Sequence, residues 1–122
     1  MSALALMSGR ASALLVRAVA LVDARLHEPD FRVDAVAEAL HLSPRHFRRL
    51  IAATTGRTPR DLLRQRRMVR ARDLLDGDAL RVEDVARAVG YANVSAFGRA
   101  FRAVTGVAPR ADARALPDIV VP

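Results

Sequence analysis

Residues 82–109 read VEDVARAVGYANVSAFGRAFRAVTGVAP, and this stretch decides how the rest of the chain is interpreted. Its second half places Phe97, Phe101 and Val104 at helical spacing, which indicates a helix that buries one face. Gly90 precedes that helix, and a glycine permits the sharp turn that would join it to a short helix before it. The stretch therefore predicts a helix, a tight turn and a second helix, with an apolar inner face and a polar outer face.

The same pattern occurs earlier in the chain. TTGRTPR at residues 54–60 is matched by VTGVAPR at residues 104–110, and Arg49 takes the place in the first copy that Arg99 takes in the second. A glycine suits the end of a helix, and a proline three residues later suits the first position of the next helix. Two copies of one small helical unit explain the repeat, whereas a solenoid would need at least three.

Glycine and proline punctuation predicts an all-α fold of seven helices, with no period-two strand pattern. The long helix that begins at Pro59 would join two helix-turn-helix subdomains. The expected helices are 12–27, 33–40, 44–55, 59–75, 82–89, 93–105 and a short one after Pro109. The expected organisation is an N-terminal extension (1–11), a domain (12–115) made of a first unit (12–58), a linking helix (59–75) and a second unit (79–115), and a tail (116–122).

The composition excludes several classes of protein. The chain has no cysteine, which removes disulfide scaffolds and thiolate metal sites. His27, His41 and His46 share neither a helical face nor a ligand spacing, so we expect no metal. No nucleophile–base pair or phosphate-cradling loop is present, so we expect neither an enzyme nor a cofactor. The apolar N-terminal stretch is short and is interrupted by Arg17, so we expect no membrane span.

The basic charge is concentrated in one part of the chain. All 20 basic residues are arginines, and ten of them lie within residues 43–72 beside a single acid, Asp61. Such a local patch is the footprint expected of a protein that binds a phosphate backbone. The alternative is an ordinary solvated helical face in an arginine-rich chain.

These residues resemble the AraC/XylS family of bacterial transcription regulators. The resemblance covers roughly residues 14–109 and rests on VDAVAEALHLSPRHFRRLI, TGRTP, RMVRARDLL and the stretch quoted first. It implies a double helix-turn-helix domain whose second helices enter adjacent major grooves of one DNA duplex. It also implies an activator that contacts RNA polymerase in the bacterial cytoplasm, at the nucleoid, and that binds as a monomer unless a further domain dimerises it. Four positions depart from the family pattern: His41, Ile51, Asp112 and Ala113.

The outward faces of the two second helices supply the candidate DNA-binding residues. An arginine can reach a guanine edge or a phosphate, and a valine can contact a thymine methyl group. The candidates are Arg45, His46, Arg48, Arg49, Asn93, Val94, Ser95, Gly98, Arg99 and Arg102. Arg67 faces partly inward, and we expect it to be structural and paired with Glu83 or Asp84.

Three other interpretations remain open at this point. The chain could be the C-terminal piece of a larger, effector-responsive regulator, with sensing in another domain. It could be a protein-interaction or antagonist module that kept the fold and lost sequence reading. Nonspecific RNA binding is disfavoured, because few exposed aromatic side chains are available for base stacking.

Overall fold

This computed structural model describes residues 3–77 and 80–109 of the chain. These residues form six helices, joined by turns and loops, and no strand. The all-α prediction is therefore confirmed, with six helices found where seven were expected. The seventh expected helix, after Pro109, and the tail 116–122 lie outside the described residues. The helices are α1 (Ala3–Arg25), α2 (Asp34–Ala39), α3 (Pro44–Thr55), α4 (Pro59–Asp76), α5 (Val82–Ala88) and α6 (Val94–Thr105).

The predicted helix boundaries hold best where capping residues mark them. The Ser43 Oγ accepts a hydrogen bond from the His46 backbone N–H at 3.1 Å, at the start of α3. Gly56 and Gly106 end α3 and α6 in the left-handed conformation, with φ of 72° and 83°. These caps satisfy backbone groups that a helix end leaves without a partner, so local chemistry is enough to place the ends.

The first helix departs from the prediction. α1 begins at Ala3, so most of the expected extension 1–11 is helical, and it ends at Arg25 although residues 12–27 were expected. Alanine and leucine in the first residues favour a helix, and the cost of one glycine is about 1 kcal/mol. Gly9 therefore does not stop the helix. At the other end, the Glu28 N–H donates to the Arg25 carbonyl in a turn, and the Leu26 carbonyl accepts from a distant arginine, Arg67.

The turns of the two units have the same geometry. His41 has a φ of 58° and Gly90 a φ of 91°, so both occupy the left-handed region. The Leu42 N–H donates to the Ala37 carbonyl and the Tyr91 N–H to the Ala86 carbonyl, each at 2.9 Å. Histidine thus does in the first turn what glycine does in the second, at the modest strain that a non-glycine residue bears there.

Each unit buries the apolar face of its second helix. Phe47 and Ile51 are buried on α3, and Phe97 and Phe101 are fully buried on α6. The rings of Phe97 and Phe101 lie 5.7 Å apart, centroid to centroid, in a tilted arrangement that suits aromatic packing. The helical spacing read from the sequence therefore identified the core face of both units.

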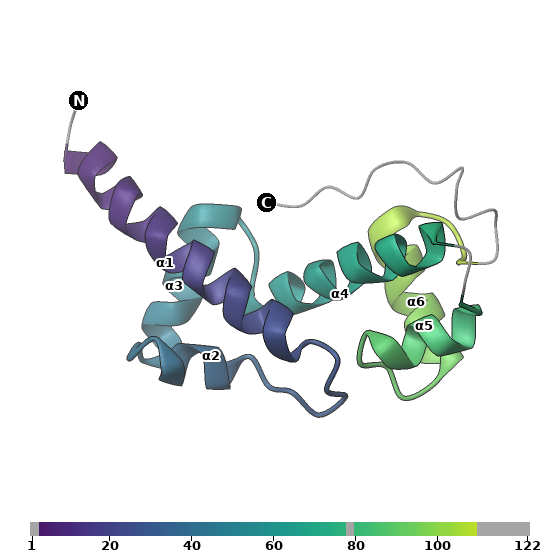
Figure 1. Cartoon of the computed structure of the whole chain (residues 1–122). Coiled ribbons are helices and arrows are strands. Elements are labelled where there is room, and N and C mark those ends of the chain that lie inside the picture. Colours follow the sequence, from purple (N-terminus) through teal and green to yellow (C-terminus); the bar gives the residue numbers. More distant parts are fainter. Residues whose placement is uncertain (1–2, 78–79, 110–122) are drawn as a thin grey trace.

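Helix α4 joins the two units (Figure 1). α1, α2 and α3 lie at one end of the molecule and α5 and α6 at the other, with α4 running between them. Among the described helices, α4 alone contacts members of both groups: α1 and α3 on one side, and α5 and α6 on the other. Its own buried residues include Leu62, Met68, Ala71 and Leu75, so the linker is part of both cores.

Candidate nucleic-acid interface

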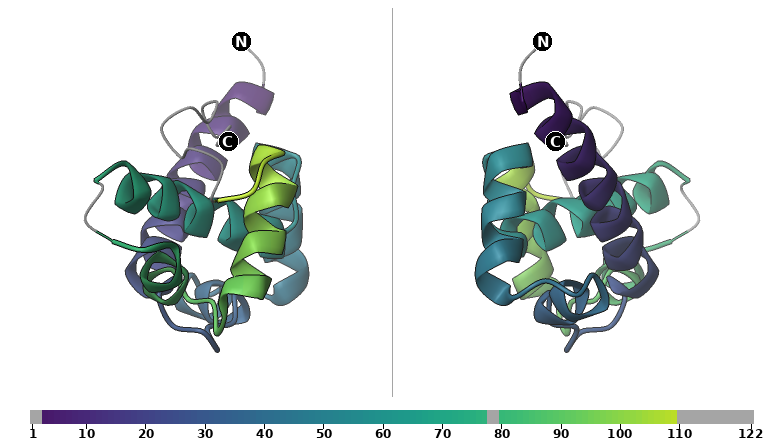
Figure 2. Two further views of the ribbon diagram at one scale, coloured as in Figure 1. Left: turned by 90° about the vertical axis from the view of Figure 1, so that its right-hand side faces the viewer. Right: turned by 90° about the vertical axis from the view of Figure 1, so that its left-hand side faces the viewer.

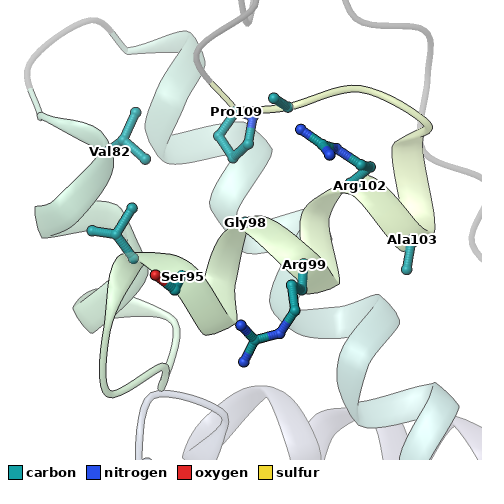
Figure 3. A pocket seen from close by; sticks show the side chains of 9 residues that line it. Val82, Ser95, Gly98, Arg99, Arg102, Ala103 and Pro109 are labelled. Carbon is teal, nitrogen blue, oxygen red and sulfur yellow. The ribbon is translucent and has the colours of Figure 1, made fainter.

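The outer face of α6 forms a shallow groove. Most of the second unit's predicted site residues meet in it, namely Val94, Ser95, Gly98, Arg99 and Arg102. Figure 3 shows Val82 and Pro109 at its edge and the Arg99 side chain projecting from the helix. The groove has a volume of about 620 Å³. It offers two guanidinium groups beside an apolar wall.

Gly98 and Asn93 have different local surroundings. A Cβ atom built at Gly98 would meet nothing within 4 Å, so protein packing does not require a glycine there. Its absence of a side chain leaves the groove open between Val94 and Arg102. Asn93 is the N-cap of α6, and its Oδ1 accepts from the Ala96 N–H at 2.8 Å. The capping bond engages the side-chain oxygen and leaves the amide NH₂ as the group available to a ligand.

The first unit presents its candidates on the exposed face of α3. Arg45, His46, Arg48 and Arg49 are all exposed, while Phe47 between them is buried. The Ser43 cap fixes the first turn of α3, so these four side chains leave the helix from a well-defined start. The face therefore concentrates basic groups within five consecutive residues of the helix.

The two exposed faces lie on the same side of the molecule. Figure 2 shows α3 and α6 running in similar directions on one side and α1 on the opposite side. In residues 3–77 and 80–109, none of the arginines on these two faces has an acidic partner: Arg45, Arg48, Arg49, Arg99 and Arg102. Their charge is therefore available to an external anion.

Two other arginines of the basic segment 43–72 form ion pairs with acidic residues. The Arg66 guanidinium makes two hydrogen bonds of 2.8 Å to the carboxylate of Asp23. Arg64 pairs with Asp61 at 3.1 Å. The count of charges within residues 43–72 thus overstates the number of arginines that a phosphate could reach.

The expected pairing of Arg67 with Glu83 or Asp84 is wrong. The Arg67 Nε donates to the Leu26 carbonyl and one terminal N–H donates to the Glu28 carbonyl, each at 2.9 Å. Glu83 and Asp84 face Arg81 instead, at 3.3 and 3.7 Å. The prediction of a structural role fits, but the acceptors are backbone carbonyls at the end of α1, which charge patterns in a sequence do not show.

A larger cleft, of about 1060 Å³, lies between the two units. It is bordered by the first turns of α2, α3 and α4, and Tyr91 lines it from the second unit. Arg48 belongs both to this cleft and to the exposed face of α3. Sequence reasoning missed Arg32 and Arg60 as members of this surface, and it missed Val82 in the α6 groove. Arg60 had a signal, because it directly follows the proline of the repeated phrase.

Within the described ranges, no helix has the length and apolar character needed to cross a membrane. Within the same ranges, no group of three or more His, Cys, Asp or Glu residues is placed to hold a metal ion.

Comparisons with known proteins place this geometry in context. A family model described as a helix-turn-helix domain matches residues 36–115. A transcriptional regulator from Chromobacterium violaceum, described as containing an AraC-type DNA-binding domain, is 27% identical, with a TM-score of 0.79 over 90% of this chain and 99% of that chain. The DNA-binding domain of AdpA, solved in complex with a target DNA, is 32% identical, with a TM-score of 0.73 over 83% of this chain and 90% of that one.

The matching curated regulators are longer than this chain. The transcriptional activator NphR from a Rhodococcus species is 35% identical over 95 residues, which cover 78% of this chain and 28% of NphR. The chain spans about three tenths of the length of the curated regulators that it matches.

Proposed function

The chain belongs to the AraC/XylS family of helix-turn-helix domains, and from this membership we propose that it binds a specific sequence of double-stranded DNA and regulates transcription. The observation that carries the proposal is the placement of α3 and α6 on one side, with arginines that have no acidic partner among the described residues. Exposed arginines on the second helices of two helix-turn-helix units suit entry into DNA major grooves and contact with phosphates.

The dimensions of the linker support binding to two adjacent grooves. α4 has 18 residues, which corresponds to about 27 Å at 1.5 Å per residue. With the bodies of the flanking units, a linker of this length would place two recognition helices about one helical turn of DNA apart, roughly 34 Å. Most helix-turn-helix proteins obtain two units by dimerising, so a single chain with two units would bind as a monomer.

The α6 groove is suited to base recognition in one half-site. Arg99 would donate to the O6 and N7 of a guanine, and Val94 and Val82 would contact a thymine methyl group. Gly98 would allow the backbone to approach the base edges closely. Ser95, Arg102 and the Asn93 amide would add contacts to bases or phosphates.

The first unit would bind through the exposed arginines of α3. Arg45, Arg48 and Arg49, with His46, would contact the major groove and its flanking phosphates. Arg32 and Arg60 border the cleft between the units, so they would face the backbone segment that passes between the two grooves. Phosphate contacts of this kind fix the register of a protein on DNA without reading bases.

In the matching relatives, the segment that resembles this chain is one part of a longer regulator. The chain spans 28% of NphR, which is described as a transcriptional activator. We propose that units 12–58 and 79–115, joined by 59–75, form the DNA-binding part of an effector-responsive activator. Its work would include contact with RNA polymerase, and its site of action would be the chromosome in the bacterial cytoplasm.

Selection of bound sites from a random DNA library tests this function directly. The expected result is one enriched site with two half-sites a helical turn apart. Fluorescence anisotropy with that site and with excess unrelated competitor DNA then measures specificity. Equal affinity for the selected site and the competitor would reject sequence-specific regulation and favour a protein-interaction module that kept the fold.

A further inference from the structure

Arg67 joins the linker helix to the end of α1. Its side chain leaves α4 and donates to the carbonyls of Leu26 and Glu28, both at 2.9 Å. These carbonyls follow the last turn of α1, and the Glu28 carbonyl also accepts from the Phe31 N–H at 3.2 Å. Only 8% of Arg67 is exposed. One guanidinium therefore holds the segment after α1 against α4, using two donors of its planar fork.

The turn of the second unit presses against the same guanidinium. A Cβ atom built at Gly90 would collide with the Leu26 carbonyl oxygen and would lie 2.9 Å from an Arg67 terminal nitrogen. The Tyr91 ring centre is 5.4 Å from the Arg67 guanidinium carbon. Leu26 and Glu28 belong to the first unit and Gly90 and Tyr91 to the second, so Arg67 lies between the two units.

The electrostatics of this contact favour a well-defined geometry. Burial lowers the pKa of Arg67, and contact with Tyr91 opposes that change. Arg67 has no carboxylate partner among residues 3–77 and 80–109, so carbonyl dipoles and the aromatic ring compensate its charge. A buried charge stabilised in this way tolerates little displacement, because each lost partner leaves a desolvated group unsatisfied.

The contact is placed where it can control how the units are oriented. No helix of the first unit contacts α5 or α6 among the described elements, and α4 alone is shared. A single shared helix fixes the separation of two bodies but constrains their rotation about its axis less well. A second attachment away from that axis, through the segment 26–28 and the turn 90–91, removes this freedom.

We infer that Arg67 is a positioning residue that fixes the orientation of the second unit relative to the first, and thereby the half-site spacing that the domain accepts on DNA. The mechanical part of this inference stands independently of ligand binding. The consequence for spacing rests on the proposed DNA-binding function.

Spin labels measure the orientation without DNA. The chain has no cysteine, so Ala52→Cys on α3 and Ala103→Cys on α6 give one labelled pair on two exposed positions. We expect a narrow distance distribution in the parent protein and in the control Arg70→Met, which changes an exposed arginine of the same helix. Arg67→Met should broaden or shift the distribution, while circular dichroism shows unchanged helix content.

Gly90→Ala tests the same contact from the other side and keeps Arg67. The added methyl group meets a backbone carbonyl, which cannot turn aside, so the turn 90–91 must move. This variant decides the question if Arg67→Met fails to fold. Unchanged distance distributions in every variant that folds would overturn the inference.

The DNA arm compares a full site with an isolated half-site. Linking two sites on one chain gives roughly 10²–10⁴-fold in apparent affinity, so Arg67→Met should lose about tenfold or more on the full site. Its affinity for a half-site should stay within about twofold of the affinity of the parent protein. Equal losses on both sites would contradict the inference. If the parent bound no DNA while the label distances still changed, the proposed function would fail and the positioning role would stand.

Discussion

Neighbouring arginines on α4 have three different surroundings. Arg66 is held by two hydrogen bonds to Asp23, Arg67 is buried against backbone carbonyls, and Arg70 is exposed. An exposed ion pair contributes little to stability, but it reduces the charge that a third group experiences. In the proposed function, phosphate binding would therefore depend on the arginines of α3 and α6 more than on the total count of arginines.

Arg99 provides the sharpest test at the level of one residue. Arg99→Ala should reduce affinity for the selected site by about 1–3 kcal/mol and relax base preference at one position of the second half-site. Anisotropy titrations with every base at each position give the measurement. Arg17→Ala, which changes an exposed arginine of α1, is the matched control and should bind as the parent does. Equal weakening on all sequences would instead indicate a phosphate contact.

The pKa of Tyr91, which lies beside Arg67 at the contact between the units, can be measured by titration. Burial raises the pKa of Tyr91, and the nearby Arg67 charge partly opposes this. The chain has one tyrosine and no tryptophan, so its phenolate absorbance in the near ultraviolet reports this group alone. We expect a midpoint above the ordinary value of about 10 in the folded protein, and the ordinary value in denaturant.

The sign of the effect on stability follows from the same shift. Between the unfolded and the folded pKa, the unfolded chain has lost the Tyr91 proton and the folded chain retains it. The free energy of unfolding should therefore be unaffected by this group below about pH 10 and should fall as the pH rises further. A Tyr91→Phe variant should lack this component. An ordinary midpoint in the folded protein would mean that the ring is not held as described.

At the scale of elements, the sequence predicts what local chemistry determines. The caps at Gly56 and Gly106 and the buried face of α6 follow from residue type and spacing, and all were predicted. The partners of Arg67 could not be predicted, because they are backbone carbonyls 39 and 41 residues away. Arg60 follows the proline of the repeated phrase and could have been noticed, whereas Arg32 could not, since its place in the cleft arises only when three helix starts come together.

The proposed binding to two grooves depends on α4 being a continuous helix. A proline at Val69 removes a helical hydrogen bond and clashes with the preceding turn, at a cost of about 3 kcal/mol or more. We expect Val69→Pro to lose affinity for the full site far more than for a half-site. Val69→Ala keeps the helix and serves as the control. Circular dichroism must show that the units remain folded, and parallel losses on the two sites would contradict a mechanical role for α4.

At the scale of the whole molecule, binding should depend strongly on salt. Arginines that displace counterions from phosphates give a slope of about −0.9 per contact in a plot of log affinity against log salt concentration. If the five arginines on α3 and α6 that lack an acidic partner in the described residues each make one phosphate contact, the slope should be about −4.5. Anisotropy across a salt series measures it, and a flat plot would exclude a DNA backbone as the ligand.

The central claim is that two units held in one register read two adjacent grooves, and a change of spacing tests it most directly. Inserting five base pairs between the half-sites turns one groove to the far side of the duplex, since a turn holds about 10–10.5 base pairs. The account predicts that the parent protein binds this altered site no better than an isolated half-site, and that a ten-base-pair insertion does not restore binding, because α4 cannot lengthen. Equal affinity for the original and the five-base-pair site would contradict the claim, because the units would then be free to turn independently.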